Sequence, residues 1–327
     1  MPLDRGAERV LRMMSVSATG AHGPPSVADR RRVLANLADS ADEHAPISVL
    51  TRVIVLPGPG GSLLGRLYIP PDAADAGLVY FHGGGWVAGG LDTHEGLCRR
   101  LAASAGVKLL AIDYRLAPEH PFPAAVEDAL AAVRWAFDNA LGLGIDPQRL
   151  AVGGDSVGGG IAAWITQSPA APPLALQVLL CPILDLVHET PSRRAYGEGF
   201  FLDAATLAAD LHDYCGEAQD LHDLRFSPLL AQELAVRTPA LIHAAEYDPF
   251  RDEAAAYAAR LTAAGADASF TCWPGMIHYF YCLARAIPNA IPAVEALGAE
   301  IRATLAPDQM RTSPRWMRSQ TAASSGT

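Results

Sequence analysis

A serine lies in a glycine-rich segment between an apolar run and an apolar helix start. Residues 153–160 read Gly-Gly-Asp-Ser-Val-Gly-Gly-Gly and contain the motif G-x-S-x-G centred on Ser156. Small residues two places before and after a serine are needed where a chain turns sharply from a strand into a helix and presents the hydroxyl. The motif therefore predicts that Ser156 is a nucleophile on a strained turn.

The same glycines also fit a phosphate-binding pattern. Gly158, Gly160 and Ala163 match G-x-G-x-x-A. This window lies within the expected helix and not at its start, and no Asp or Glu follows about 20 residues later at the end of a strand, where such loops need one. We therefore favour a nucleophilic serine over a nucleotide-binding loop.

A nucleophilic serine needs hydrogen-bond donors for the oxyanion that it generates. The sequence His-Gly-Gly-Gly at 82–85 directly follows the apolar run 78–81. Glycines at such a position let backbone N–H groups approach a substrate oxygen. We expect Gly83, Gly84 and Val157, the residue after the serine, to form an oxyanion hole. The alternative is an ordinary tight turn, which would not need three glycines.

The serine also needs a base and an acid that orients the base. Asp248 follows the apolar run 240–244, and His278 follows a run that ends at Cys272, so both lie beyond the carboxyl ends of expected strands. The chain order Ser, Asp, His is one of the known orders of serine triads. We expect His278 to accept the proton of Ser156 and Asp248 to orient the His278 ring.

Other titratable residues have simpler interpretations. Asp252 and Glu253 open an expected helix, where negative charge suits the helix dipole. His243 lies inside an expected strand, which is typical of a hydrogen-bonded core histidine. The His, Cys and acidic residues show no metal-ligand spacing. The sequence therefore predicts neither a metal nor a cofactor.

Short apolar runs alternate with amphipathic segments from residue 49 onward, which is typical of βαβ units and a largely parallel sheet. The first two runs flank a turn rich in Gly and Pro and predict a hairpin. The clearest helix patterns cover 124–140 and 252–264. Strands are expected at 49–56, 63–69, 78–81, 107–112, 150–152, 174–180, 240–244 and 268–272.

Two segments interrupt this alternation. The first contains helix candidates at 4–14 and 26–39, and the second contains one at 203–214. Segments inserted into an α/β core tend to cover the sheet edge where ligands bind. The predicted organisation is a helical cap at 1–45, a catalytic α/β domain at 46–306 with a helical insertion at 186–235 that adds to the cap, and a disordered tail at 307–327.

Composition excludes several classes of protein. The chain has 327 residues, of which 50% are hydrophobic, and a net charge of −10. It is therefore globular, and its negative charge argues against nucleic acid or an anionic membrane as the main partner. We interpret the basic run Arg30–Arg32 as a solvated helix face.

Targeting signals and cysteine usage indicate the compartment. The longest apolar stretch, 174–187, is too short to span a membrane. Charged residues occupy positions 4–9, where a signal peptide would need its apolar core. Five cysteines without a C-x-x-C pair are typical of reduced, buried thiols. We expect a cytoplasmic protein without disulfides.

Four ordered blocks resemble those of the hormone-sensitive-lipase-like (bacterial family IV) carboxylesterases of the α/β-hydrolase superfamily, and the similarity extends over about residues 45 to 305. The resemblance implies an eight-stranded α/β-hydrolase core with a helical cap and activity on esters of short to medium acyl chains. It makes Ser156 the nucleophile, Asp248 the acid in place of Asp252, and His278 the base. It also makes Gly83 and Gly84 the oxyanion donors. The blocks are HGGGW at 82–86, DYRLAPEHPFPA at 113–124, GDSVGG at 154–159 and DPFRDE at 248–253.

The chain departs from the family pattern at two positions. Val157 replaces the usual Ala after the serine, and Tyr279 replaces the usual Gly after the histidine. We expect Trp86, Asp155 and Tyr279 to contribute to the substrate pocket. For Tyr279, plain packing at a helix start is an equal alternative.

The residues favour a serine carboxylesterase acting on a small ester. The same triad could act on lactones, amides or acylated drugs, because fold and triad do not select among them. A non-catalytic binder, as in the plant gibberellin receptors that resemble this family, is disfavoured because those proteins lack the histidine and His278 is present. The last strand, near 268–272, would be a sheet edge through which a homodimer could form.

Overall fold

The computed structural model describes residues 1–18, 25–41, 48–216, 220–234 and 236–306. The segment 307–327, expected to be a disordered tail, lies outside the described residues. The expected boundary between residues 45 and 46 lies outside them as well.

One eight-stranded sheet forms the centre of the molecule, in the order β1-β2-β4-β3-β5-β6-β7-β8. β2 pairs antiparallel with β1 and with β4, and the other neighbours pair in parallel. The predicted mostly parallel eight-stranded α/β fold is therefore confirmed. The strands are β1 (Leu50–Gly58), β2 (Gly61–Ile69), β3 (Gly77–Phe81), β4 (Lys108–Asp113), β5 (Leu150–Asp155), β6 (Leu176–Leu180), β7 (Ala240–Tyr247) and β8 (Ala268–Ile277).

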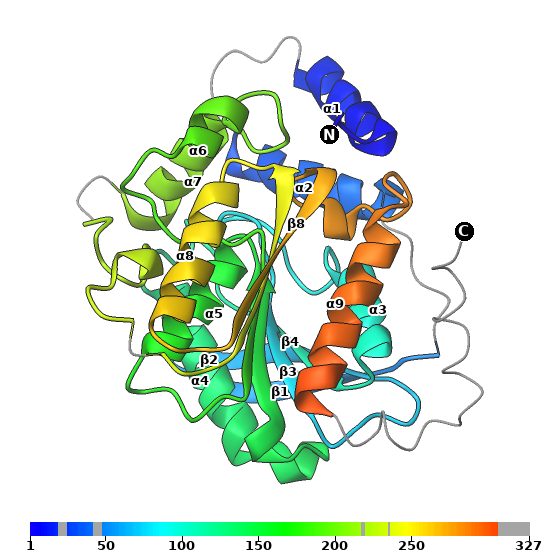
Figure 1. Cartoon of the computed structure of the whole chain (residues 1–327), viewed down its shortest axis with the longest axis vertical. Helices are drawn as coiled ribbons and strands as arrows, with labels where there is room; N and C mark the ends of the chain where they lie inside the picture. Colours follow the sequence, from blue (N-terminus) through cyan, green and yellow to red (C-terminus); the bar gives the residue numbers. More distant parts are fainter. Residues whose placement is uncertain (19–24, 42–47, 217–219, 235, 307–327) are drawn as a thin grey trace.

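Helices cover both faces of this sheet (Figure 1). α4, α5 and α8 lie on one face, and α3 and α9 lie on the other. Every residue of β3, β5 and β6 is buried, as expected for parallel strands between two helical layers. The five helices are α3 (Glu95–Ala105), α4 (Ala124–Asp138), α5 (Val157–Gln167), α8 (Arg251–Ala263) and α9 (Ala290–Leu305). Short 3₁₀ helices lie at Ala140–Leu143, Pro147–Arg149, Pro228–Leu230 and Phe280–Cys282.

Four further helices gather at the end of the molecule to which the arrowheads of β7 and β8 point (Figure 1). In parallel sheets this carboxyl edge is where ligands bind. No helix in the described ranges is both long enough and apolar enough to cross a bilayer. The four helices are α1 (Arg5–Ala18), α2 (Val27–Ala41), α6 (Pro191–Tyr196) and α7 (Ala204–Cys215).

The last strand is longer than its sequence pattern predicts. β8 was expected to end at Cys272, but it continues through Pro274 and Gly275 to Ile277. Gly275 has a φ of +75°, and the pairing with β7 shifts register near Ala245. A proline is tolerated on an edge strand, and a glycine with positive φ accommodates an irregularity. β8 therefore delivers His278 directly from its last residue.

The expectation of a solvated basic face at Arg30–Arg32 is wrong for two of the three side chains. The Arg30 side chain is only 8% exposed and forms ion pairs with Asp210 and Asp213 of α7. Arg32 alone is well exposed, at 67%. The pattern of charges does not reveal this, because the acidic partners lie about 180 residues away.

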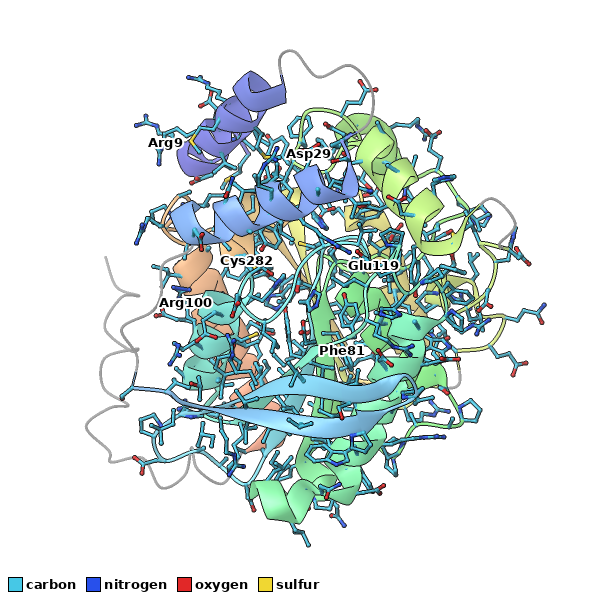
Figure 2. The ribbon with its side chains drawn as sticks, turned by 180° about the vertical axis from the view of Figure 1, so that it is seen from behind. Arg9, Asp29, Phe81, Arg100, Glu119 and Cys282 are labelled. Atoms are coloured by element: carbon cyan, nitrogen blue, oxygen red, sulfur yellow. The ribbon has the colours of Figure 1, made fainter. Side chains whose placement is uncertain are left out.

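Arg31 binds the core from the same helix. It donates to the carbonyl oxygens of Val87 at 2.8 Å and Ala117 at 2.9 Å, and it pairs with Glu119 at 2.6 Å. Figure 2 labels Glu119 close to α2. α2 is therefore attached both to the core loops and, through Arg30, to α7.

Candidate active site

Ser156 occupies a strained turn between β5 and α5. Its backbone has φ +54° and ψ −121°, a conformation that residues other than glycine rarely adopt. A Cβ at Gly154 or Gly158 would come within 2.4 Å or 2.0 Å of the Phe81 carbonyl oxygen. The two glycines of G-x-S-x-G are thus required by the close approach of β3, as the motif predicts.

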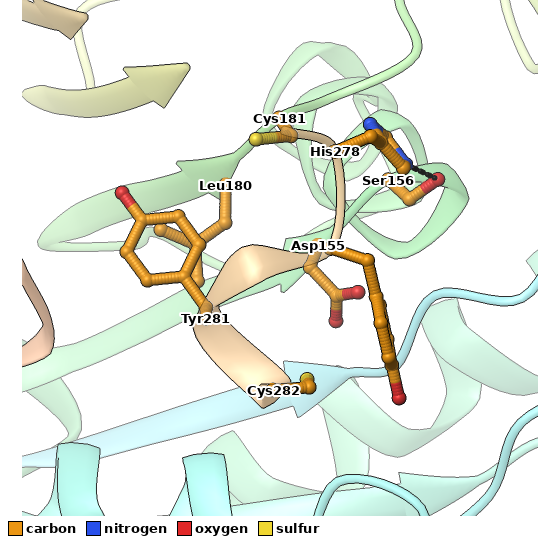
Figure 3. A pocket seen from close by; sticks show the side chains of 8 residues that line it. Asp155, Ser156, Leu180, Cys181, His278, Tyr281 and Cys282 are labelled. Atoms are coloured by element: carbon orange, nitrogen blue, oxygen red, sulfur yellow. Dashed lines mark hydrogen bonds between the residues drawn. The ribbon is translucent and has the colours of Figure 1, made fainter. Parts of the chain in front are cut away.

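Ser156, His278 and Asp248 form one continuous chain of hydrogen bonds. The Nε2 atom of His278 lies 3.0 Å from Ser156 Oγ, and its Nδ1 atom lies 2.8 Å from Asp248 Oδ2. Figure 3 shows the bond between Ser156 and His278. Asp248 also accepts the Phe250 N–H on Oδ1 at 2.8 Å. All three triad residues are buried. With the Nδ1 proton on the Asp248 side, Nε2 has a lone pair for the serine proton.

The surroundings make His278 a stronger base. Burial lowers the pKa of His278, but the charge of Asp248 and its hydrogen bond raise it, with a further contribution from the charge of Asp155. The net effect raises the pKa of His278 above its usual value. The buried carboxylates therefore stabilise the imidazolium that forms when Ser156 loses its proton.

The structure corrects the expected oxyanion donors. The N–H of Gly83 donates to Asp155 Oδ1 at 3.0 Å and is not available to a substrate. Gly84 and Gly85 have φ values of +119° and +64°, and within the described ranges no group accepts a hydrogen bond from their N–H groups. Val157 opens α5, so its N–H has no acceptor within the helix. Gly84 and Val157 thus remain candidates, and Gly85 replaces Gly83.

Asp155 anchors the glycine run. Besides Gly83, its carboxylate accepts the Tyr80 hydroxyl at 2.8 Å and lies 3.2 Å from Nε2 of His94. Burial raises the pKa of Asp155, but His94 and Tyr80 outweigh it and lower the pKa overall. The carboxylate is therefore charged, and its two oxygens are engaged by the Gly83 N–H, the Tyr80 hydroxyl and the His94 ring. Asp155 also lines the small cavity beside Ser156, and its contribution to a substrate pocket stays a prediction.

Tyr279 adopts a backbone conformation that suits glycine. Its φ is +67°, which explains why the family commonly has Gly at this position. The ring stacks on Phe201, with centroids 5.4 Å apart, and the hydroxyl donates to the Thr93 carbonyl at 3.2 Å. The side chain is thus packed against its neighbours, and it also lines the cavity beside Ser156. Its part in substrate binding stays a prediction.

Trp86 follows the glycine run and lies under α7. Its ring is buried and stacks on Tyr214 with a centroid distance of 4.8 Å and nearly parallel planes. A Cβ at Gly85 would come within 2.1 Å of the Asp210 carboxylate on the same helix. The insertion therefore packs directly on the glycine run, and the role of Trp86 in a substrate pocket stays a prediction.

A small cavity borders the nucleophile (Figure 3). Its volume is about 10 Å³, which is room for one water molecule. Sequence reasoning missed Cys181 in its wall, because nothing in the spacing links this residue to the triad. The lining residues are Asp155, Ser156, Leu180, Cys181, His278, Tyr279, Tyr281 and Cys282.

Glu253 does more than complement a helix dipole. It lies in the first turn of α8 as expected, but it is buried and accepts the Leu184 N–H at 2.6 Å. It also pairs with Arg193 at 2.9 Å. Burial raises the pKa of Glu253 to about 8, although Arg193 opposes this shift. Glu253 thus ties the insertion to the core next to Asp248.

His243 is the hydrogen-bonded core histidine that its strand position predicts. Its Nδ1 atom lies 3.1 Å from both the Tyr281 hydroxyl and the Trp273 indole nitrogen. Its Nε2 atom lies 3.2 Å from Glu300. Both ring nitrogens are engaged away from Ser156, so His243 does not compete with His278 for the Ser156 hydroxyl.

Comparisons with known proteins agree with the fold and this geometry. A family model described as alpha/beta hydrolase fold matches residues 78–282. An ethyl acetate hydrolase of Pseudomonas putida is 41% identical over 305 residues, which cover 90% of this chain and 93% of that protein. The solved structure of an ester hydrolase from the Lake Arreo metagenome has a TM-score of 0.87 at 37% identity, covering 92% of this chain and 98% of that chain.

A hyperthermophilic esterase of the archaeon Pyrobaculum calidifontis has a TM-score of 0.85 at 35% identity, covering 93% of this chain and 99% of that chain. The chain therefore belongs to the α/β-hydrolase superfamily, in its hormone-sensitive-lipase-like branch. The resemblance carried by the four sequence blocks is confirmed.

Proposed function

We propose that this protein is a serine carboxylesterase that hydrolyses esters of short- to medium-chain carboxylic acids. The observation that carries the proposal is the unbroken hydrogen-bond chain from Ser156 Oγ through His278 to Asp248. The similarity to an ethyl acetate hydrolase and to several other ester hydrolases supports the same reaction class.

The reaction follows from the geometry. Ser156 Oγ attacks the ester carbonyl while Nε2 of His278 accepts its proton, and Asp248 stabilises the resulting imidazolium. The N–H groups of Gly84, Gly85 and Val157 stabilise the oxyanion. The tetrahedral intermediate collapses, and His278 returns the proton to the leaving alcohol. Water, deprotonated by His278, then hydrolyses the acyl-enzyme.

We also propose that residues 1–45 and 186–235 together form a cap over this site. The ion pairs from Arg30 on α2 to Asp210 and Asp213 on α7 support a joint role, because they join the two segments directly. The stacking of Tyr214 on Trp86 supports a position above the glycine run. In this arrangement the cap sets the size of the acyl chain that the site admits.

The edge strand and the cysteines support proposals about the oligomeric state and the cellular compartment. β8 is an edge strand, and its Phe270 is 37% exposed, which favours a homodimer formed through this edge. None of the five cysteines, all of which lie in the described ranges, forms a disulfide, which suits a reducing, cytoplasmic compartment.

The decisive experiment replaces the nucleophile. Ser156→Ala is expected to lower kcat for p-nitrophenyl acetate by several orders of magnitude, on the order of 10⁶ as for other triads. Ser168→Ala, just after α5, is the matched control and should keep the wild-type rate. A fluorophosphonate probe should label the wild type and not Ser156→Ala. Near-normal hydrolysis by Ser156→Ala would overturn the proposal, and an unlabelled, inactive wild type would indicate a binder.

A further inference from the structure

Three groups that can bind metal ions meet at the proposed triad. Cys181 follows β6, Asp248 follows β7 and His278 follows β8. The Cys181 sulfur, one carboxylate oxygen of Asp248 and one ring nitrogen of His278 all lie within 4.8 Å of one another, and the three residues are buried. No sequence spacing predicts this cluster, because each group comes from the end of a different strand.

The backbone holds Cys181 in place for such a contact. Its φ is +44°, in the left-handed region, and its N–H donates to the His243 carbonyl at 2.7 Å. Its sulfur lies within 4.8 Å of a carboxylate oxygen of Asp248. Cys181 and His278 both line the cavity of about 10 Å³ beside Ser156 (Figure 3). This space adjoins the cluster and is large enough for a single ion or water.

We propose that Cys181, Asp248 and His278 form an inhibitory site for a thiophilic divalent cation, such as Zn²⁺ or Cd²⁺. This inference rests on the proposed esterase function. One sulfur, one nitrogen and one oxygen are a donor set that Zn²⁺ accepts. The thiolate and the carboxylate carry two negative charges, which balance a divalent ion. A balanced charge matters here, because an uncompensated charge in a buried site is costly.

Only small movements are needed to bring the three donors to bonding distance. Tetrahedral Zn²⁺ with ligand bonds of about 2.0–2.3 Å places its donor atoms roughly 3.3–3.8 Å apart. The Nδ1 atom of His278 and Oδ2 of Asp248, now 2.8 Å apart, would separate slightly. The Cys181 sulfur, within 4.8 Å of one carboxylate oxygen of Asp248 and one ring nitrogen of His278, would approach them by about 1 Å. Rotations of side chains supply displacements of this size.

Binding would block the proposed mechanism through the imidazole tautomer. The ion forms bonds to Sγ, Oδ2 and Nδ1, the S–H bond breaks, and one proton leaves for solvent. The proton that Nδ1 carried moves to Nε2 of the same ring. Nε2–H then faces Ser156 and has no lone pair for the serine proton. The enzyme should therefore lose activity without any change at Ser156 itself.

The first test measures binding without relying on activity. Ser156→Ala is titrated with Co²⁺, which substitutes for Zn²⁺ and shows a charge-transfer absorption when a thiolate binds it. The band should appear in Ser156→Ala and in Ser156→Ala/Cys272→Ser, whose missing thiol lies elsewhere. It should be absent from Ser156→Ala/Cys181→Ser and Ser156→Ala/Cys181→Ala. A band that survives the loss of Cys181, or no band in Ser156→Ala, would overturn the proposal.

The second test measures inhibition, with each variant compared with its own metal-free rate. Zn²⁺ or Cd²⁺ should inhibit ester hydrolysis by the wild type and by Cys272→Ser, and EDTA should restore the rate. Cys181→Ser should need at least about tenfold more metal, since losing even an outer partner of a metal site costs tenfold or more. Cys181→Ala provides the same comparison if the serine variant does not fold. Equal sensitivity of the wild type and the Cys181 variants would refute the site. If the esterase proposal itself failed, no metal-free rate would exist, and the Co²⁺ titration would still decide.

Discussion

Tyr279 combines an unfavourable backbone conformation with extensive packing. A left-handed φ costs a residue with a Cβ about 1–2 kcal/mol, but the ring packs on Phe201 and borders the nucleophile cavity. Tyr279→Gly should relieve the strain and still lower the free energy of unfolding by about 2 kcal/mol, because deleting a buried aromatic ring costs more than the strain. It should also raise kcat/KM for p-nitrophenyl octanoate relative to acetate at least about tenfold.

Tyr279→Phe is the matched control for this prediction. It keeps the ring and removes the hydroxyl, and with it the hydrogen bond to the Thr93 carbonyl. It should therefore cost about 1 kcal/mol and leave the ratio of the octanoate and acetate rates unchanged. Steady-state kinetics on esters of graded length and urea unfolding measure both effects. If the glycine variant kept the wild-type ratio, Tyr279 would be a packing residue with no part in substrate selection.

The raised pKa of His278 predicts the acid limb of the pH profile. The ring must be neutral to accept the Ser156 proton, so kcat/KM should fall as the pH drops through the pKa of His278. Because the Asp248 carboxylate raises that pKa, the midpoint should lie above the ordinary value of 6.5, with a plateau on the alkaline side. Asp248→Asn should lower kcat by about 10⁴ and shift the midpoint downward. A wild-type midpoint below 6.5 would contradict this assignment.

Sequence and structure agree on the triad more closely than on the oxyanion donors, for a physical reason. The nucleophile, acid and base follow from a local motif and the ends of strands, which sequence patterns reveal. The N–H groups that are free for a substrate depend on the position of the Asp155 carboxylate, which takes the N–H of Gly83. Three consecutive glycines signalled a special loop, but only the fold shows that Asp155 takes the N–H of Gly83, and Gly84 and Gly85 stay a proposal. No sequence pattern pointed to Cys181 either, because it meets the triad only in the folded chain.

Among the helices, α2 and α7 are joined by a buried cluster of charges that predicts a pH-dependent stability. Arg30→Met would leave Asp210 and Asp213 without their cation and should lower the free energy of unfolding by about 3 kcal/mol near neutral pH. Burial raises the pKa of Asp210 to about 7, with Arg30 opposing and Asp213 adding to the shift. Without Arg30 the pKa of Asp210 would rise further, because the opposing cation is gone. Protonation of Asp210 relieves its repulsion with Asp213, so the loss should shrink as the pH falls toward 5.

Arg32→Met, on the same helix, is the control. Its exposed side chain should contribute nothing measurable to stability. Urea unfolding of both variants at several pH values makes the comparison. Equal, small losses for Arg30→Met and Arg32→Met would show that the two helices are not held together by the buried charges.

The elements show where periodicity is a sufficient guide and where it is not. Apolar runs located all eight strands of the described sheet, and for β3, β5 and β6 burial between helical layers demands such runs. The same reasoning ended β8 too early, at Cys272, because the alternation of residue types does not reveal the irregular pairing near Gly275, which has a positive φ. It also interpreted Arg30 as solvated, because a helix face that binds a distant helix looks like one that faces water.

For the whole molecule, the edge position of β8 predicts self-association. Two copies related by a two-fold axis can pair their β8 strands and extend the sheet, covering Phe270, which is 37% exposed. Phe270→Lys would place like charges near one another across that axis, so the dimer should dissociate at micromolar concentration. The value of kcat should stay the same, because Phe270 lies several residues before His278 on the strand. Leu141→Lys, at an 82% exposed position in a 3₁₀ helix, should leave the dimer intact. Light scattering during size-exclusion chromatography measures both masses, and a monomeric wild type would rule out the edge as an interface.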